Sequence, residues 1–206
     1  MQQPRAVFRV PLGRSLTVVT LLLVASALGG LIVAHDWATL IRSWPLLALA
    51  GFVSWMLFWR PRVIVDGHVV WVINVVRTWR IPLVRLKSLE VRFGVTLGTD
   101  EGTVTAWAAS APGRHEALRL SRGDFTAIPR RSGVEQFARP AEATSTESGA
   151  AAFVIAQRWA DVTGDSTTPE PKVESAHEKT SRTWHTASLL VSGLLGVATI
   201  ITLTLP

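Results

Sequence analysis

The chain has 206 residues, which suffice for one small domain with membrane anchors but not for two large domains. Hydrophobic residues make up 48% of the chain and its formal net charge is +6, a combination typical of apolar membrane spans flanked by basic residues. The absence of cysteine excludes disulfides, thiol nucleophiles and cysteine-rich metal sites.

Three apolar stretches dominate the chain, at residues 15–34, 44–59 and 185–205. A hydrocarbon core of about 30 Å requires about 20 helical residues, and the first and third stretches meet this length without a charged residue. The second stretch is shorter and is preceded by Arg42. Because the connection at 35–43 is short, we predict a transmembrane hairpin followed, after a soluble block, by a third span.

Small residues recur every four positions in the third stretch, at Ser188, Ser192 and Gly196. This spacing lets two helices approach closely in a membrane. Packing against the hairpin of the same chain is the simpler interpretation, and packing against a second copy is the alternative.

Basic residues indicate the orientation of the spans. They flank the soluble ends of the three stretches: Arg5, Arg9, Arg14, Arg60, Arg62, Lys179 and Arg182. Only Arg42 lies in the predicted hairpin loop, so the positive-inside rule places the N-terminus and the soluble block in the cytoplasm and the C-terminus outside. Arg60 and Arg62, with Trp44 and Trp59 at the ends of the second stretch, are the predicted interface anchors.

A cleaved signal peptide is the alternative for the first stretch, because arginines, an apolar core and Ala25-Ser26-Ala27 resemble its three regions. The apolar residues continue beyond that site through Val33. Cleavage would also place Arg60 and Arg62 on the translocated side, against the charge rule. The membrane hairpin therefore remains the prediction.

Between the second and third stretches the sequence has the pattern of short strands. Predicted strands cover residues 62–66, 68–76, 77–82, 89–93, 95–99 and 103–109, with turns at Gly67 and at Asp100–Gly102. The run 69–76 is apolar on both faces, so one face should meet the core and the other a helix, a partner or the bilayer surface. Closely spaced strands of this kind predict an antiparallel sheet or partial barrel.

A long loop is predicted at 110–143, where glycine, proline and charged residues replace the strand pattern. A helix over residues 149–162 follows, capped by Thr146 or Ser148 and ended by Gly164. Its predicted apolar stripe consists of Phe153, Ile155, Trp159 and Val162.

Several segments resemble the small, actinobacterial kind of bacterial PH domain-containing membrane protein. They include FRVPLGRSLTVVT (8–20), RTWRIPLVRLKSLEVRFG (77–94) and SGAAAFVIAQRW (148–159). The resemblance covers most of the chain in order and implies a PH-like antiparallel barrel capped by one C-terminal helix. It supplies no defined biochemical role. A complete PH barrel has seven strands, whereas about six are readable here, so the seventh lies near Leu118–Leu120 or is absent.

The predicted organisation has five parts. They are a basic N-terminal tail (1–14), a transmembrane hairpin (15–60), a PH-like domain (61–164), a linker (165–184) and a C-terminal transmembrane helix (185–206). The fold class is therefore membrane α-helical anchors joined to an α+β domain.

One basic cluster is a candidate binding site: Arg77, Arg80, Arg85, Lys87 and Arg92. PH-like domains often bind anionic headgroups through basic residues near the open end of the barrel, so the resemblance implies lipid or partner binding here. The alternative is an ordinary solvated strand face, because alternation along a strand divides such residues between two faces.

Motifs for phosphate binding, dinucleotide binding, zinc proteases and serine hydrolases are absent, and the five histidines lack metal-ligand spacing. We therefore predict no enzyme activity, no cofactor and no metal site. The net charge is not accompanied by a nucleic-acid-binding motif, so no nucleic-acid partner is predicted.

The predicted function is a non-enzymatic binding module on the cytoplasmic face of a bacterial plasma membrane, recruiting or regulating an envelope protein partner. Residues 69–76 and 110–143 are the candidate contacts. Sensing of anionic lipid headgroups is the alternative function.

Overall fold

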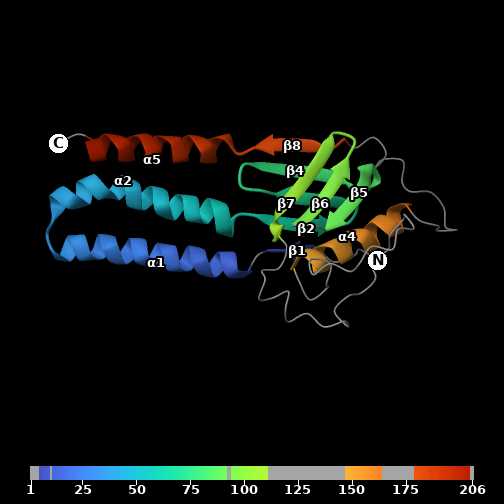
Figure 1. The fold of residues 1–206 in the computed structure, drawn as a ribbon, viewed down its shortest axis with the longest axis horizontal. Helices are drawn as coiled ribbons and strands as arrows, with labels where there is room; N and C mark the ends of the chain where they lie inside the picture. The colour runs from blue at the N-terminus through green and yellow to red at the C-terminus, as the bar shows by residue number, and fades with distance from the viewer. Residues whose placement is uncertain (1–4, 10, 92–93, 111–146, 164–178, 205–206) are drawn as a thin grey trace. The chain divides into compact units, whose positions relative to one another are not determined.

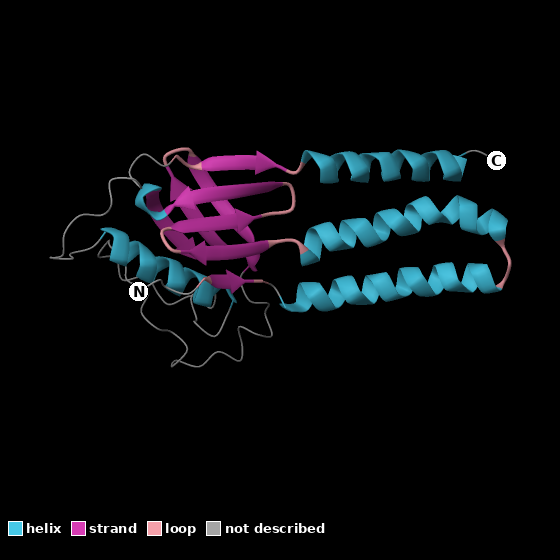
Figure 2. Ribbon diagram, turned by 180° about the vertical axis from the view of Figure 1, so that it is seen from behind, coloured by secondary structure: helices cyan, strands magenta, loops and turns pink. Residues whose placement is uncertain are grey.

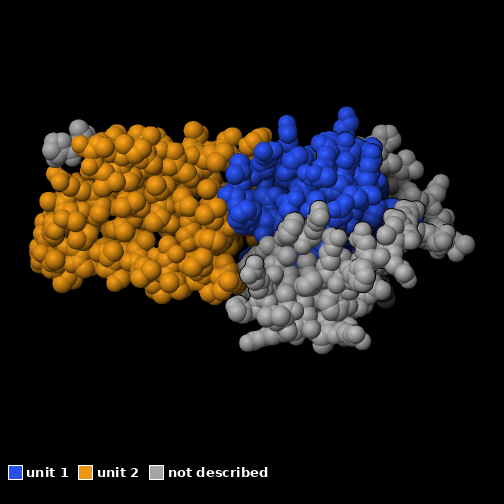
Figure 3. Space-filling view, in the orientation of Figure 1, with its two compact units in different colours: residues 1–10, 62–183 blue, residues 11–61, 184–206 orange. Residues whose placement is uncertain are grey.

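The computed structural model describes residues 5–9, 11–91, 94–110, 147–163 and 179–204. The chain forms two compact units (Figure 3). The helical unit comprises residues 11–61 and 184–206, and the strand unit comprises residues 1–10 and 62–183. Figure 2 shows the strands gathered in one unit and the long helices in the other.

Three helices build the helical unit (Figure 1). They are α1 (Pro11–Val33), α2 (Trp37–Ser54), which continues as a π-helical turn (Trp55–Trp59), and α5 (Thr186–Thr204). All three are long and apolar enough to cross a membrane, the second over Trp37–Trp59. Helix α2 contacts both α1 and α5. The three predicted spans are thus present as helices.

The second span begins earlier than the sequence pattern predicted. Asp36 caps α2 by accepting a hydrogen bond from the backbone N–H of Thr39 at 3.0 Å, so the link to α1 is a tight turn in which His35 has φ +54°. The prediction that Arg42 lies in the loop is wrong, since this residue is within α2. It is exposed about five residues from the helix start, close enough for its long side chain to reach the interface.

Close packing between α1 and the end of α2 depends on small residues. A Cβ added to Gly13 would lie 2.8 Å from the carbonyl oxygen of Phe58. The buried Thr17 hydroxyl lies 3.0 Å from the backbone oxygen of Gly13 and 3.4 Å from the backbone oxygen of Ser54, and it can donate to either. Helices in a membrane associate through this combination of small side chains and polar contacts.

Two of the three regularly spaced small residues of α5, Ser188 and Ser192, contact other parts of the same chain. Arg60 Nη1 donates to Ser188 Oγ at 2.7 Å, and Ser192 Oγ lies 4.0 Å from the sulfur of Met56. A Cβ on Gly196 would meet nothing within 4 Å. The predicted intramolecular packing is therefore confirmed for Ser188 and Ser192.

The strand unit contains two antiparallel sheets. Sheet A has the order β1-β2-β3-β4-β8 and sheet B the order β5-β6-β7. The strands are β1 (Ala6–Phe8), β2 (Arg62–Asp66), β3 (Val69–Ile73), β4 (Arg77–Pro82), β5 (Leu86–Val91), β6 (Gly94–Thr99), β7 (Gly102–Ser110) and β8 (Ser181–Trp184). A 3₁₀ turn at Leu83–Arg85 joins β4 to β5. Strand β7 also contacts β2 and β3, which closes the two sheets around a shared core.

Two strands lie where the sequence predicted none. Strand β1 falls in the segment taken as a tail and pairs with β2, with Phe8 opposite Val63. Strand β8 falls at the end of the predicted linker and pairs with β4. Strands of three and four residues are too short to show alternation, so only their pairing reveals them. Of the loop predicted at 110–143, Ser110 is the last residue of β7, and residues 111–143, which include 118–120, lie outside the described residues.

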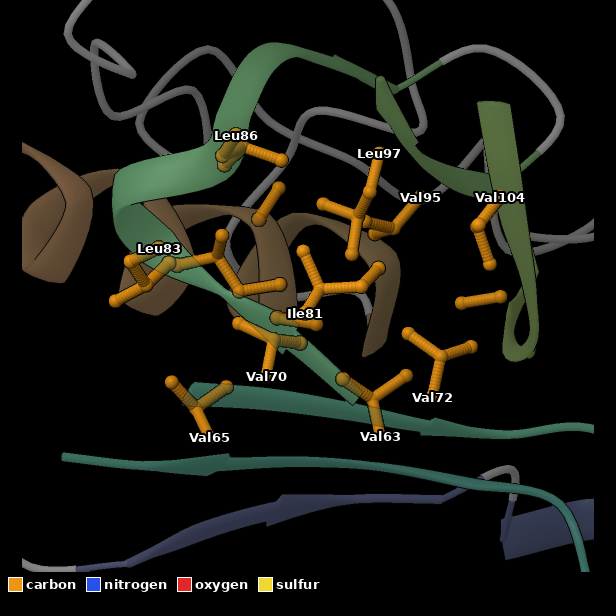
Figure 4. Close-up of a cluster of buried hydrophobic side chains, with 14 of the residues drawn as sticks. Val63, Val65, Val70, Val72, Ile81, Leu83, Leu86, Val95, Leu97 and Val104 are labelled. Carbon is orange, nitrogen blue, oxygen red and sulfur yellow. The ribbon is translucent and has the colours of Figure 1, made fainter. Parts of the chain in front are cut away.

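The core of the strand unit lies between the sheets and helix α4 (Glu147–Thr163) (Figure 4). It contains Val63, Val65, Val70, Val72, Ile81, Leu83, Leu86, Val91, Val95, Leu97, Val104, Ala106, Ala151, Ala152 and Ile155. Of the predicted helix stripe, Ile155 is fully buried and Trp159 and Val162 pack against the core. The alanines that complete the buried face carry no periodic signal of their own.

Helix α4 is also tied to sheet A by a polar contact. Arg158 is only 7% exposed and donates from Nη1 to the Val65 backbone oxygen at 2.9 Å. A buried guanidinium requires such partners. The helix is therefore an integral part of the strand unit.

Candidate functional site

The four residues of the predicted basic cluster that the structure describes lie on three different elements. Arg77 and Arg80 lie on β4, Arg85 lies in the 3₁₀ turn, and Lys87 lies on β5. Arg92 lies outside the described residues. Alternation along β4 puts Arg77 and Arg80 on opposite faces of sheet A.

Arg85 and Lys87 converge on Asp100 in the turn between β6 and β7. Lys87 Nζ lies 2.6 Å and Arg85 Nη1 3.6 Å from the carboxylate oxygens. The hydrogen bond from Lys87 is the main cause that lowers the pKa of Asp100. Burial opposes it, and the positive charges of Lys87 and Arg85 lower the pKa further. All three side chains are well exposed, so the cluster adds little stability, and its positive charge is partly neutralised.

The outer face of sheet A carries a cross-strand row of mainly apolar residues: Val7, Ile64, Trp71 and Arg80. Ile64 is only 4% exposed although it points away from the core, whereas Val7 is 46% exposed. The Arg80 guanidinium carbon lies 5.5 Å from the centroid of the Trp71 ring, within cation–π range. We call these four residues the outer row.

The sequence of residues 69–76 is apolar on both faces of the strand, and the outer row explains the second apolar face. Val70 and Val72 are fully buried in the core, and Val69, Trp71 and Ile73 alternate onto the outer face, where they are half-buried. A sheet that is apolar on both faces normally has both faces covered. The outer face is therefore a candidate for protein contact.

A second feature is the tip of the β3–β4 hairpin. Asn74 donates from Nδ2 to the backbone oxygen of Thr105 at 2.9 Å and accepts at Oδ1 from the backbone N–H of Trp107 at 2.8 Å. Its own N–H donates to the Arg77 oxygen at 2.9 Å. One side chain thereby joins the hairpin of sheet A to β7. We call Ile73–Arg77 together with Thr105 and Trp107 the Asn74 rim.

Sequence reasoning did not single out Asn74. Asparagine between two β-branched runs is a turn signal, but its link to Thr105 and Trp107 depends on a pairing between distant strands. Trp107 is 56% exposed, and Val75 and Val76 are half-buried at the tip. The rim thus presents apolar side chains beside the basic Arg77.

The helical unit gathers arginine and tryptophan around the end of α2. The guanidinium carbons of Arg60 and Arg14 each lie 5.6 Å from a ring centroid, Arg60 from Trp55 and Arg14 from Trp59. Burial lowers the pKa of His185, and the positive charge of Arg60 lowers it further. Tryptophan and arginine at the end of a span are typical of a membrane–water interface.

The four predicted interface anchors occupy different places. Trp59 and Arg60 lie at the end of the π-helical turn, and Arg62 is the first residue of β2. Trp44 lies seven residues inside α2, because that helix begins at Trp37. At the other end of this span Trp37, which is 54% exposed, occupies the position expected of an interfacial ring.

Within the described ranges, no three histidine or acidic side chains lie close enough together to hold a metal ion. No protein-family model matches the chain, and no curated protein or solved structure is significantly similar to it. The function is therefore inferred from the residues and their geometry.

Proposed function

We propose that the protein is a non-enzymatic, membrane-anchored binding module of a bacterial plasma membrane, which recruits or regulates an envelope protein through a PH-like domain on the cytoplasmic face. The single observation that carries this proposal is the apolar outer row of sheet A in a domain tethered to membrane-spanning helices. Tethering removes the need for lipid affinity to reach the membrane, so the outer face is available for another partner.

The strand order supports the PH-like interpretation. Among the residues that the structure describes, seven strands precede α4, four of them in sheet A (β1 to β4) and three in sheet B (β5 to β7). Seven strands followed by one helix is the arrangement that the sequence resemblance implies. The seventh strand is then β1, ahead of the first span, and β8 is an addition to the pattern.

Strand pairing also supports the proposed topology. Because β1 precedes α1 and β2 follows α2, their direct pairing requires two spans to leave and re-enter on the same side. Strand β8 belongs to the same sheet and directly precedes α5, so a single further crossing carries the C-terminal end to the other side. Arg60 and Arg62 favour the cytoplasm for the strand unit.

Sensing of anionic headgroups by one basic patch receives less support. The four described cluster residues occupy three places, and two of them share Asp100. Attraction to a charged membrane surface falls off within a Debye length, about 8 Å at physiological ionic strength. Charges that are spread over both faces and both ends of a strand do not act on one headgroup together.

In-cell photocrosslinking tests the proposed recruitment. A benzophenone amino acid at Val7 or Thr78, on the outer face of sheet A, should give a discrete protein adduct in cells of the native host. Trp71→Ala should abolish it, because a buried tryptophan anchor commonly contributes about 2 kcal/mol or more to binding. The same probe at Glu101, an exposed turn residue, is the matched control. Equal adduct patterns at Val7, Thr78 and Glu101 would refute recruitment through this face.

A further inference from the structure

The Asn74 rim has the composition of a surface that contacts a membrane interface. Its apolar side chains are the half-buried Val75 and Val76 and the exposed Trp107, with Arg77 beside them. Tryptophan and arginine are the residues that settle at headgroup level, and short apolar side chains beside them can enter the boundary between headgroups and acyl chains. Asn74 joins the hairpin to β7 by two hydrogen bonds, so these side chains share one support.

Chain connectivity keeps this end of sheet A near the bilayer. Two residues separate Trp59, at the end of the second span, from Arg62, and Arg62 pairs with Ile73 of the rim. Two residues likewise separate Phe8 from the start of α1, and Phe8 pairs with Val63. Three peptide steps reach at most about 11 Å. Two independent tethers therefore hold the Ile73 end of the sheet close to the membrane surface, whatever the orientation of the strand unit.

The opposite end of the sheet has a different character. From Arg77 to Pro82 strand β4 extends about 17 Å, and the chain then passes into the turn with Arg85 and on to Lys87, which pairs with Asp100. Asp66 is also at this far end, beside the Gly67 turn. One carboxylate, Glu90 of β5, lies toward the tethered end, where Glu90 pairs with Thr96 and Thr96 pairs with Thr105. The tethered end thus combines apolar side chains with Arg77, whereas the basic residues of the far end, Arg85 and Lys87, share the carboxylate of Asp100.

We propose that the Asn74 rim dips into the interfacial layer of the protein's own bilayer. Val75, Val76 and Trp107 enter the region between headgroups and acyl chains, and Arg77 lies at the level of the lipid phosphates. The occupant of this surface is the lipid of the membrane that the chain itself spans. The rim thereby adds a fourth membrane attachment to the three helices and fixes the tilt of the strand unit.

Spin labelling of the full chain in lipid nanodiscs tests this inference, and the absence of native cysteine makes single-site labels clean. Nitroxides are placed through Val75→Cys and, independently, Val76→Cys, with Glu101→Cys in the β6–β7 turn as the matched control. The probes are oxygen, which concentrates in the bilayer, and a water-soluble nickel chelate. We expect the ratio of oxygen to nickel collisions to be several-fold higher at both rim sites than at Glu101.

Two results would overturn the proposal. Rim labels that collide with the nickel chelate as often as the Glu101 label would place the rim in water. Rim labels shielded from both probes would place it against protein, either another part of the chain or a second copy. Because the experiment uses purified protein and lipid alone, neither result depends on the recruitment of an envelope protein.

Discussion

The Gly13→Val substitution should destabilise the helical unit by about 1–3 kcal/mol, the usual cost of forcing extra atoms into a packed contact. The added Cβ would lie 2.8 Å from the Phe58 carbonyl oxygen, and a backbone atom cannot rotate away as a flexible side chain can. Thermal unfolding of the purified full chain in detergent micelles, followed by hydrogen exchange of α1 and α2 peptides, measures the change.

Gly30→Val on the same helix is the matched control, because a Cβ there would meet nothing within 4 Å. It introduces the same β-branched residue into the same span, so it corrects for any effect of valine on the helix itself. Equal melting temperatures for the two variants would show that α1 does not pack against the end of α2.

Replacing Ile155 by alanine should destabilise the strand unit by about 2–5 kcal/mol, the range for truncating a fully buried aliphatic side chain. Ile155 is fully buried among the core residues of both sheets. We expect faster hydrogen exchange throughout β2, β3 and β6 of the full chain, because the loss of core packing lowers the free energy of unfolding of the whole unit.

Gln157→Ala provides the comparison, since Gln157 is exposed on the same helix. It should leave exchange in the sheets unchanged. If Ile155→Ala accelerated exchange in α4 alone, the helix would be an appendage of the sheets and not part of their core.

The apolar stretches predicted the three spans, because an apolar stretch of the right length is a strong signal of a transmembrane helix. The start of the second span was missed because Arg42 breaks the apolar pattern, whereas the helix is set by the Asp36 cap and tolerates an exposed arginine near its end. Strand β1 was missed because a strand of three residues depends on its partner β2, which is more than 50 residues away in sequence.

The candidate sites show the same division between local and long-range information. The apolar character of both faces of β3 is a local pattern, and the structure places those faces in the core and the outer row. The five basic residues are close in sequence, but strand alternation and the turn after β4 separate the four that the structure describes. Asn74 carries no local sign of its contacts, which become visible only when β7 lies beside the hairpin.

We propose that the strand unit lies on the cytoplasmic side and that its sheet is held together across a membrane hairpin. Single cysteines introduced by Glu101→Cys in the strand unit, His35→Cys in the hairpin turn and Thr204→Cys near the C-terminal end test it directly. Intact bacterial cells are treated with a membrane-impermeant maleimide and compared with lysed cells.

We expect His35→Cys and Thr204→Cys to label in intact cells and Glu101→Cys to label only after lysis. Labelling of Glu101→Cys in intact cells, with protection of the other two, would place the strand unit outside and contradict the cytoplasmic assignment. Identical labelling of His35→Cys and Glu101→Cys would contradict the hairpin itself.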